Sequence, residues 1–336
     1  MPEETPPSVA LHQLMVGHWV SQALCVAAEL GIADHMASSP SDVSELARAV
    51  SAHPRALFRL MRALASVGVF TEVAPRRFAL TPVGDCLRAT SATSLRALAL
   101  TVNSLDWAAW AEMRHSLRTG ETAFQHVHQM GPFDYFHRNP EVGKTFDEAM
   151  TGFVTQNGAA IVEAYDFRGL RRIIDVGGGV GTLMMSILRS SPEITGVVFD
   201  LPDVIAVAEQ RVERAGLAAR CDCVGGSFFE TAPADGDAYI MASIIHDWDA
   251  DHCRRILATC RAAMPSSAKL LLVEMVIPAG NAPFFGKLLD LEMLVCFGGQ
   301  ERTEEEYREL LNATGFRLTR VVPTRTPSSI LEALPC

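Results

Sequence analysis

The chain has 336 residues, 49% hydrophobic and 20% charged, and a formal net charge of −10 at pH 7. This apolar content excludes a disordered protein. Apolar runs such as Leu270–Val273 are far shorter than the ~20 residues of a membrane-spanning helix. The acidic balance makes nucleic acid or an anionic membrane a poor generic partner. We therefore expect no nucleic-acid and no membrane partner.

The cysteines and the N-terminal residues bear on the cellular compartment. Eight cysteines are scattered along the chain, and none forms a Cys-x-x-Cys pair. Met1–Pro7 contains two Glu and no Lys or Arg, unlike the basic start of a signal peptide. Reduced thiols in a cytoplasmic protein are the simplest interpretation.

Residues 8–100 predict helices followed by a small β-hairpin. Apolar residues recur at helical spacing, and a capping box at Ser41 or Asp42 predicts a helix start. The predicted elements are a helix over Leu11–Leu30, a helix from Ser41 or Asp42 to Val50, a helix over His53–Val67, and strands at Val69–Val73 and Arg77–Leu80. Helix, helix and hairpin in this order are typical of a winged-helix domain.

The rest of the chain predicts a helical segment and then an α/β domain. Residues 94–165 are helical and rich in aromatic residues, whereas strands and helices alternate from Arg171 onward, as in a parallel, doubly wound sheet. The predicted strands are Ile173–Val176, Gly196–Phe199, a strand before Gly225, Ala238–Met241 and Leu270–Ile277, and the helices cover 180–189, 203–216, 251–264 and Thr303–Thr314.

The C-terminal residues predict an antiparallel end to this sheet. Phe316–Val322 and Ser328–Leu334 are joined by a link too short for a parallel crossover. We predict three parts of the chain: a helical domain over 1–100, a helical linker over 101–165 that contributes to the substrate pocket, and a Rossmann-like domain over 166–336.

A glycine-rich segment, Asp175–Gly181, follows the first strand of the α/β domain. Glycine there permits a tight turn and a close approach to a ligand. The spacing fails the dinucleotide rule Gly-x-Gly-x-x-Gly, because Thr182 stands where the third glycine is needed. An acidic residue followed by glycines at every second position resembles the nucleoside-binding loop of S-adenosylmethionine (SAM) methyltransferases.

Polar or aromatic residues follow three further strands of the predicted sheet. Asp200 ends the second strand, where a carboxylate can accept the hydroxyls of a ribose. It could alternatively cap the helix after Pro202. Ser227 and Phe228 follow the third strand, and His246 follows the fourth. Ligands of open α/β sheets bind beyond these strand ends, so the residues converge on one crevice.

The acidic residues around His246 do not predict a metal site. Asp247, Asp249 and Asp251 have the spacing of an EF-hand, but His252 replaces the required Gly and Ala258 the required Glu. His246 and His252 match no common zinc spacing. We expect no metal.

Five motifs in order resemble one family. They are Asp175-Val-Gly-Gly-Gly, Phe199-Asp-Leu-Pro, Gly225-Gly-Ser-Phe, His246-Asp-Trp and Gly298-Gly-Gln-Glu-Arg-Thr. The chain resembles the small-molecule O-methyltransferases typified by plant caffeate and flavonoid enzymes, and among these the bacterial branch that modifies antibiotics, polyketides and phenazines. The resemblance spans nearly the whole chain and implies an N-terminal winged-helix dimerisation domain, a homodimer, and a Rossmann-like SAM-binding domain ending in an antiparallel strand.

The resemblance also implies roles for individual residues. His246 would be the general base, flanked by Glu274 and Glu301. The cofactor would contact Gly177, Asp200, Ser227, Phe228 and Ser243, although the family usually has Asp where Ser227 stands. Phe146, Met150, Met293 and Phe297 would line the pocket of an aromatic acceptor.

We therefore predict SAM-dependent transfer of a methyl group to a hydroxyl of an aromatic secondary metabolite. Two alternatives remain open at this point: a winged-helix, small-molecule-responsive DNA-binding regulator, and a SAM-binding relative without transferase activity. Residues 41–100 hold eight Arg against four acidic residues, but the Arg55, Arg59 and Arg62 face lacks Asn or Gln that would read bases.

Overall fold

The computed structural model describes residues 5–37 and 39–336. The chain divides into two compact units. The first holds the described residues of Met1–Ala108 and Phe136–Gly152, and the second holds Ala109–Tyr135 and Phe153–Cys336. The segment 101–165, predicted as a linker, contributes to both units. No helix among the described residues has the length and hydropathy needed to cross a bilayer.

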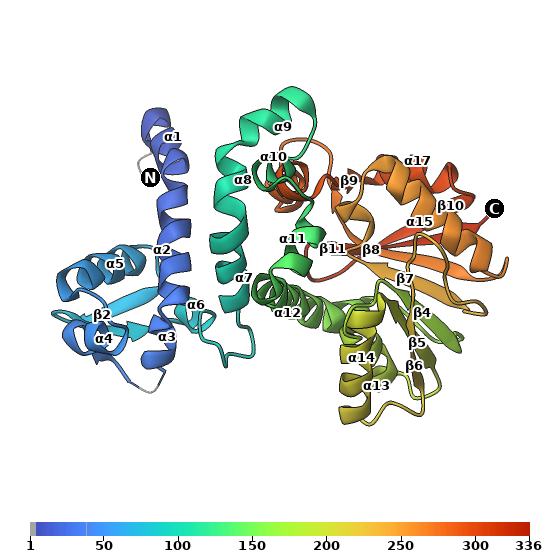
Figure 1. Ribbon diagram of the computed structural model, residues 1–336, viewed down its shortest axis with the longest axis horizontal. Coiled ribbons are helices and arrows are strands. Elements are labelled where there is room, and N and C mark those ends of the chain that lie inside the picture. The colour runs from blue at the N-terminus through green and yellow to red at the C-terminus, as the bar shows by residue number, and fades with distance from the viewer. Residues whose placement is uncertain (1–4, 38) are drawn as a thin grey trace. The chain divides into compact units, whose positions relative to one another are not determined.

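The first unit is mainly helical and contains a three-stranded antiparallel sheet with the order β1-β3-β2. Its elements are α1 (Pro7–Met15), α2 (Gly17–Glu29), α3 (Ile32–His35), β1 (Ser41–Asp42), α4 (Val43–Ala49), α5 (Pro54–Ser66), β2 (Phe70–Ala74), β3 (Arg77–Leu80), α6 (Pro82–Asp85), α7 (Arg96–Thr101) and the π-helical turn η1 (Val102–Asp106). Two helices followed by a hairpin, α4, α5, β2 and β3, stand in the predicted order (Figure 1).

One local prediction in this unit needs correction, and one open alternative is resolved. The helix predicted over Leu11–Leu30 is divided at Val16, whose ψ of 3° lies outside the helical range, and Gly17 beside it lowers the local helix propensity. Helix α4 begins after Asp42, whose Oδ1 accepts the Ser44 N–H at 2.7 Å. Asp42 is thus the capping residue, and Ser41 lies in β1.

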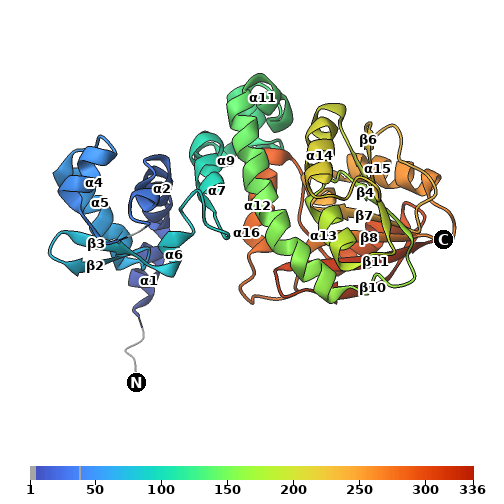
Figure 2. The ribbon, with the colours of Figure 1, turned by 90° about the horizontal axis from the view of Figure 1, so that it is seen from below.

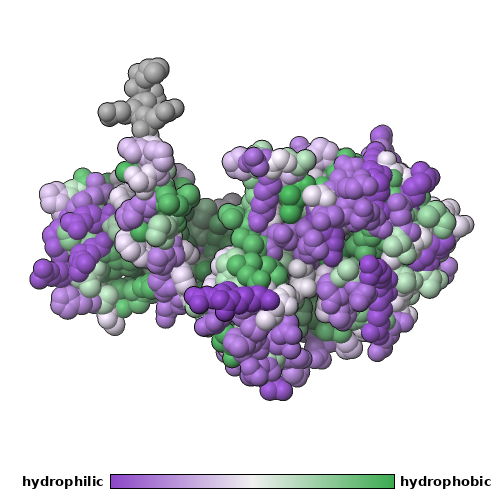
Figure 3. Space-filling model, turned by 90° about the horizontal axis from the view of Figure 1, so that it is seen from above, coloured by the Kyte–Doolittle hydropathy of each residue, from purple (hydrophilic) through white to green (hydrophobic). Residues whose placement is uncertain are grey.

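Helices α1 and α2 carry unusually exposed apolar side chains. Leu14 is 78% exposed and Trp19 62% exposed, and Val9, Leu11 and Met15 are exposed as well. Figure 3 shows hydrophobic side chains beside hydrophilic ones at the surface of this unit. Contiguous exposed apolar residues of this kind mark interaction surfaces.

The second unit is built on a mixed sheet of order β10-β11-β8-β7-β4-β5-β6. Its strands are β4 (Arg172–Val176), β5 (Thr195–Asp200), β6 (Cys221–Gly225), β7 (Ala238–Ala242), β8 (Lys269–Ile277), β10 (Phe316–Pro323) and β11 (Ser328–Pro335), and the short β9 (Arg302–Thr303) pairs with the end of β8. Strands β4 to β8 are parallel, whereas β11 is antiparallel to β8 and β10 to β11, as predicted.

Helices cover both faces of this sheet (Figures 1 and 2). They include α13 (Thr182–Ser190), α14 (Pro202–Arg214), α15 (Ala250–Ala263) and α17 (Glu304–Asn312). Neighbouring strand residues alternate between two cores, so that Ile173 packs with the α13 and α14 side and Ile174 with the α15 and α17 side. This alternation explains why the central strands are near-continuous apolar runs.

The remaining helical elements precede the sheet, follow β7 or follow β8. They are α8 (Trp107–Ala111), α9 (Met113–Thr119), α10 (Ala123–His128), α11 (Pro132–Arg138), the long α12 (Pro140–Ala164), α16 (Gly286–Glu292), and two short elements, the 3-10 turn η2 (Ile245–Asp247) and the π-helical turn η3 (Met293–Phe297). The catalytic candidates lie at the carboxyl ends of β7 and β8: His246 in the turn η2, Glu274 in β8, and Glu301 between η3 and β9.

Candidate functional site

The turn between β4 and α13 is an open backbone cradle. Gly177, Gly179 and Gly181 have φ of 71°, 55° and 78°, a region that only glycine adopts readily. A Cβ added at Gly177 would lie 2.5 Å from Ile244 Cδ1 and 3.5 Å from Phe228 Cε1, whereas a Cβ at Gly179 would meet nothing within 4 Å. The turn thus borders the ends of β6 and β7 and leaves open space above Gly179.

Asp200 at the end of β5 is joined to this turn. Its Oδ2 accepts the Gly179 N–H at 2.8 Å and its Oδ1 accepts the Leu201 N–H at 2.7 Å. Burial raises the pKa of this carboxyl against the lowering effect of those two bonds. Helix α14 has Leu201 at its N-cap and no side-chain capping bond, so capping does not explain Asp200.

Asp175, which begins the glycine motif, is a site residue that sequence reasoning left without a role. It is 1% exposed, and its Oδ2 has no hydrogen-bond partner among the described residues. Burial and the nearby Asp200 carboxylate raise its pKa to about 7. The cradle, the Asp200 carboxylate and this unpartnered buried oxygen together fit a nucleoside cofactor with a ribose and a cationic end, as SAM has.

The other predicted cofactor residues lie around the same turn. Phe228 is half-buried, and its ring lies 4.9 Å from that of Phe229 and 6.1 Å from that of Trp248. Ser227 accepts the Phe229 N–H on its hydroxyl at 3.3 Å. Ser243 has a φ of 56°, and its N–H donates to the Val273 carbonyl of β8. Their contacts to the cofactor remain predictions.

His246, Glu274 and Glu301 form one buried cluster. His246 Nδ1 lies 2.7 Å from Glu301 Oε1 and 3.9 Å from Glu274 Oε2. Both glutamates are 1% exposed, whereas the imidazole keeps 13% of its surface exposed. Glu274 Oε1 accepts the N–H groups of Ile244 and Ile245, which anchors it to the loop that carries the histidine. The structure therefore brings together the three residues predicted as catalytic.

Three carboxylates face this single imidazole. Besides the two glutamates, Asp247 Oδ1 lies 3.4 Å from His246 Nε2. Burial lowers the pKa of His246, but the carboxylates of Asp247, Glu274 and Glu301 outweigh it and raise the value to about 10. Burial raises the pKa of Glu274 to about 7 and that of Asp247 to about 6, although the imidazole opposes both shifts. The cluster thus holds protons more tightly than its separate groups would.

The same three side chains also raise the question of a metal ion. One atom from each of His246, Glu274 and Glu301 lies within 4.8 Å of the others. Two ligands of one tetrahedral ion, each about 2.0–2.1 Å from it, would stand more than ~3 Å apart. The 2.7 Å between Nδ1 and Glu301 Oε1 is shorter and fits a direct hydrogen bond.

The predicted acceptor residues divide between the two units. Met293, 4% exposed, and the half-buried Phe297 begin and end η3 in the second unit. Phe146 and Met150 lie on the part of α12 that belongs to the first unit, where Phe146 stacks on Phe136 at 4.5 Å. The acceptor-binding role of all four remains a prediction.

Phe133, to which the sequence analysis gave no role, joins the aromatic groups of the second unit. It is 44% exposed. Its ring stacks on Trp248 at 5.7 Å and lies 6.1 Å from Phe297. Its signal in the sequence is weak, because an aromatic residue in a helical segment is most simply read as core.

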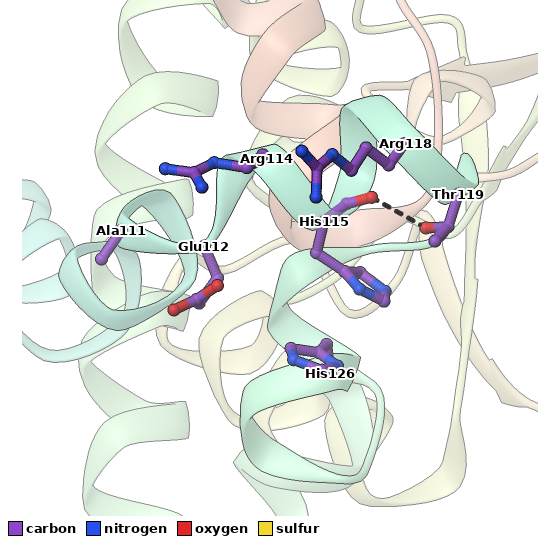
Figure 4. A pocket seen from close by; sticks show the side chains of 7 residues that line it. All are labelled: Ala111, Glu112, Arg114, His115, Arg118, Thr119 and His126. Carbon is purple, nitrogen blue, oxygen red and sulfur yellow. Dashed lines mark hydrogen bonds between the residues drawn. The ribbon is translucent and has the colours of Figure 1, made fainter.

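A surface hollow of about 370 Å³ lies elsewhere in the second unit (Figure 4). Residues of α8 to α10 line it, among them Arg114, His115, Arg118 and His126. The rings of His115 and His126 stack 4.1 Å apart, and His115 Nε2 lies 3.7 Å from a Glu121 carboxylate oxygen. None of the residues predicted to bind cofactor or acceptor lines this hollow.

Comparison with known proteins agrees with this geometry. Residues 110–317 match the O-methyltransferase domain, and residues 12–90 match the O-methyltransferase dimerisation domain. A phenazine O-methyltransferase of Lysobacter antibioticus is 46% identical over 330 residues, covering 98% of this chain and 97% of the relative.

Solved structures agree as well. That of LaPhzM, 46% identical, has a TM-score of 0.94 and covers 99% of this chain and 100% of its own. That of CalO1, a methyltransferase of calicheamicin biosynthesis in its S-adenosylhomocysteine-bound form, is 32% identical with a TM-score of 0.88, covering 100% of both chains.

These matches settle the main alternatives. They confirm the predicted fold class and SAM as the cofactor, and they favour the enzyme over the DNA-binding regulator. The match to the dimerisation domain confirms the predicted homodimer. The chain belongs to the SAM-dependent O-methyltransferase family.

Proposed function

We propose that this enzyme methylates a hydroxyl group on an aromatic secondary metabolite, of the phenazine or polyketide class, and that His246 removes the hydroxyl proton. The supporting observation is the buried pair of His246 Nδ1 and Glu301 Oε1, 2.7 Å apart. A carboxylate bonded to one ring nitrogen fixes the orientation of the imidazole. The other nitrogen, Nε2, would then take the acceptor's proton, and Asp247 Oδ1 lies 3.4 Å from it. The phenazine class is supported by the name of the relative from Lysobacter.

The pKa of His246 suits this proton transfer. An ordinary phenol has a pKa of ~10, and free imidazole, at ~6.5, would be a weak base toward it. The surrounding carboxylates raise the pKa of His246 to about 10, so the transfer from a phenol is nearly balanced. The imidazole must first lose its own proton, and turnover should therefore rise with pH toward that value.

Bound SAM would supply an electrophilic methyl group on a sulfonium. The residues of the chain would hold and align the reactants: Gly177 and Asp200 the nucleoside, Phe228 the adenine, with contributions from Ser227 and Ser243. Met293 and Phe297, together with Phe146 and Met150, would hold the acceptor. Alignment of this kind accounts for a large share of rate enhancement in two-substrate reactions.

The catalytic proposal is tested by His246→Ala with two acceptors, an ordinary phenol and one already ionised at the assay pH. A mass-spectrometric screen of hydroxylated aromatics with SAM, scored by the gain of one methyl, first supplies the acceptors. We expect the variant to lose about 10²–10⁴-fold in turnover on the ordinary phenol. The loss should shrink on the ionised acceptor, which needs no base. Equal losses on both would show that His246 is structural.

The cofactor contacts are tested by Asp200→Ala. Removing a carboxylate that accepts ribose hydroxyls should weaken SAM binding by about 1–3 kcal/mol, measured by calorimetry. Asp203→Ala is a matched control, because Asp203 is an exposed residue in the first turn of α14. Unchanged SAM affinity in Asp200→Ala would contradict the assignment.

We also propose that the enzyme acts in the cytoplasm. All eight cysteines lie in described parts of the chain, and none of them forms a disulfide. Such a thiol-rich chain is typical of a reducing compartment. Fractionation of cells that express the tagged enzyme tests this location.

A further inference from the structure

A buried arginine lies directly behind the loop that carries His246. Arg302 is 4% exposed and belongs to the short strand β9. Its guanidinium donates hydrogen bonds to three backbone carbonyls, those of Gln300 at 3.0 Å, Ile245 at 3.2 Å and Trp248 at 3.3 Å. A fourth contact is to the sulfur of Cys253 at 3.5 Å.

The partners of Arg302 are unusual for a buried charge. Arginine is rarely buried unless it is paired with a carboxylate. Within the described chain, no carboxylate accepts a hydrogen bond from Arg302 or forms an ion pair with it. The guanidinium donates instead to neutral carbonyls and a thiol. The hydrogen bonds of the arginine therefore fix the conformation of the backbone.

The carbonyls that Arg302 holds flank the catalytic pair on both sides. Ile245 directly precedes His246, and Trp248 follows it by two residues. The guanidinium therefore hydrogen-bonds the backbone at both ends of the η2 turn. Gln300 directly precedes Glu301. One planar group thus connects the segment that carries the imidazole to the segment that carries its carboxylate partner.

Other contacts join the segment that carries His246 to the segment that carries Glu301. The Gln300 N–H donates to the His246 carbonyl at 2.8 Å, and a Cβ at Gly299 would overlap that carbonyl oxygen. Beside the guanidinium, the thiol of Cys253 donates to the carbonyls of Ile245 and Trp248 at 3.2 and 3.3 Å. Arg302 and Cys253 thus bond the same two carbonyls of the loop, and Arg302 is the charged member of the pair.

We propose that Arg302 is a positioning residue for methyl transfer: by holding the carbonyls on either side of His246 and before Glu301, it sets the 2.7 Å contact between imidazole and carboxylate. This inference rests on the proposed role of His246 as general base. Displacements of about 1 Å in such an arrangement can cost ~10²-fold in rate.

Lysine is the informative replacement at this position. It keeps the positive charge, but its single ammonium cannot reproduce the planar fork that reaches carbonyls in two segments. Arg302→Lys should therefore lower turnover about 10–100-fold on an ordinary phenol and leave the SAM dissociation constant within about twofold. The loss should shrink on an acceptor already ionised at the assay pH.

Arg308→Lys is the matched control. Arg308 lies on α17 and pairs with Glu304 and Glu305 of the same helix. We expect its turnover to stay within about twofold of the wild type, as for surface changes in general. Wild-type turnover in Arg302→Lys, or an equal loss on both acceptors, would overturn the proposal.

A double variant separates this proposal from the one on which it rests. If Arg302 acts through the imidazole, Arg302→Lys should cost little more in a chain that already carries His246→Ala, because coupled residues are not additive. An equal cost in both backgrounds would overturn the positioning role. If His246→Ala shows the base phenotype and Arg302→Lys does not, the general base stands and only the role of Arg302 fails.

A second variant keeps the test decisive should Arg302→Lys fail to fold. Cys253→Ala leaves the arginine in place but removes the thiol bonds to the same two carbonyls. We expect a loss of about two- to fivefold, again larger on the ordinary phenol, since the support is only partly removed. A folded Cys253→Ala enzyme with equal losses on both acceptors, or none, would overturn the proposal.

Discussion

The second unit contains two buried charged clusters, which shift the pKa of a glutamate in opposite directions. Around Glu332 on β11, every neighbour donates: the Tyr165 hydroxyl at 2.5 Å, Arg320 at 3.0 Å and Lys269 at 3.1 Å. Burial raises the pKa of Glu332, but these donors outweigh it and lower the value to about 2. This carboxylate is fully compensated and holds the antiparallel edge of the sheet together.

Around His246 the balance is reversed. Three carboxylates share one imidazole, and Glu274 Oε2 and Glu301 Oε2 are buried without a hydrogen-bond partner anywhere in the described residues. Burial raises the pKa of Glu274 to about 7, whereas the donors around Glu332 lower the pKa of that residue. Uncompensated buried charge costs stability, and such strain persists at functional sites. The comparison indicates that the Glu332 cluster stabilises the fold. The His246 cluster lowers the stability of the fold, and its arrangement suits proton transfer.

The largest expected effect is on turnover, in Glu301→Gln. Glutamine keeps the shape but loses the charge that orients the imidazole and stabilises its cation. We expect turnover on an ordinary phenol to fall about 10²-fold, with the free energy of unfolding changed little. Glu309→Gln on the exposed side of α17 is the control, expected within about twofold. Steady-state kinetics checks the first, and a turnover that matches the control would contradict it.

The next effect is on stability, in Glu332→Gln. Removing the charge leaves Arg320 and Lys269 without their carboxylate, and we expect a loss of about 2 kcal/mol in the free energy of unfolding, with turnover unchanged. The folded pKa of about 2 lies below the usual 4.5, so the contribution is present above pH 4.5 and is lost as pH falls toward 2. Urea unfolding at pH 7 and at pH 3 should therefore show a smaller difference at pH 3. A pH-independent difference would mean that Glu332 acts by shape alone.

The fold was largely predictable, because its signals are local. The central strands are apolar runs between helices, and the short link between β10 and β11 left room only for an antiparallel pair. The edge strand β6 has the polar sequence Cys-Asp-Cys-Val-Gly, which carries no apolar run of its own. The helical segment α16–η3 was missed, although it contains Met293 and Phe297, since no cap or clear periodicity marks it.

The site was predictable only in part. Spacing alone cannot show that Glu301 lies beside a histidine 55 residues earlier; that proximity depends on how β8, β9 and η2 meet, and it was expected from the family resemblance. Arg302 was not recognised because an arginine after a glutamate at a helix start looks like solvated charge. Its burial appears only when the His246 loop packs on β9.

The smallest expected effect sharpens the comparison most, because its sign is unusual. Glu274→Gln removes a buried charge that the cluster does not compensate, while its Oε1 can still accept the Ile244 and Ile245 N–H groups. The folded pKa of Glu274, about 7, lies above the usual 4.5, so the wild type loses stability as pH rises through 7. At pH 8.5 the variant should thus be more stable by about 1 kcal/mol, and at pH 5 the gain should vanish.

Thermal unfolding at both pH values measures this gain in stability, with Glu309→Gln as the control for a lost surface charge. The rise of turnover with pH should move to lower pH at the same time, because the imidazole loses one of the carboxylates that raise its pKa. A variant less stable than the wild type at pH 8.5 would show that Glu274 is compensated after all, as Glu332 is, and the contrast between the two clusters would not hold.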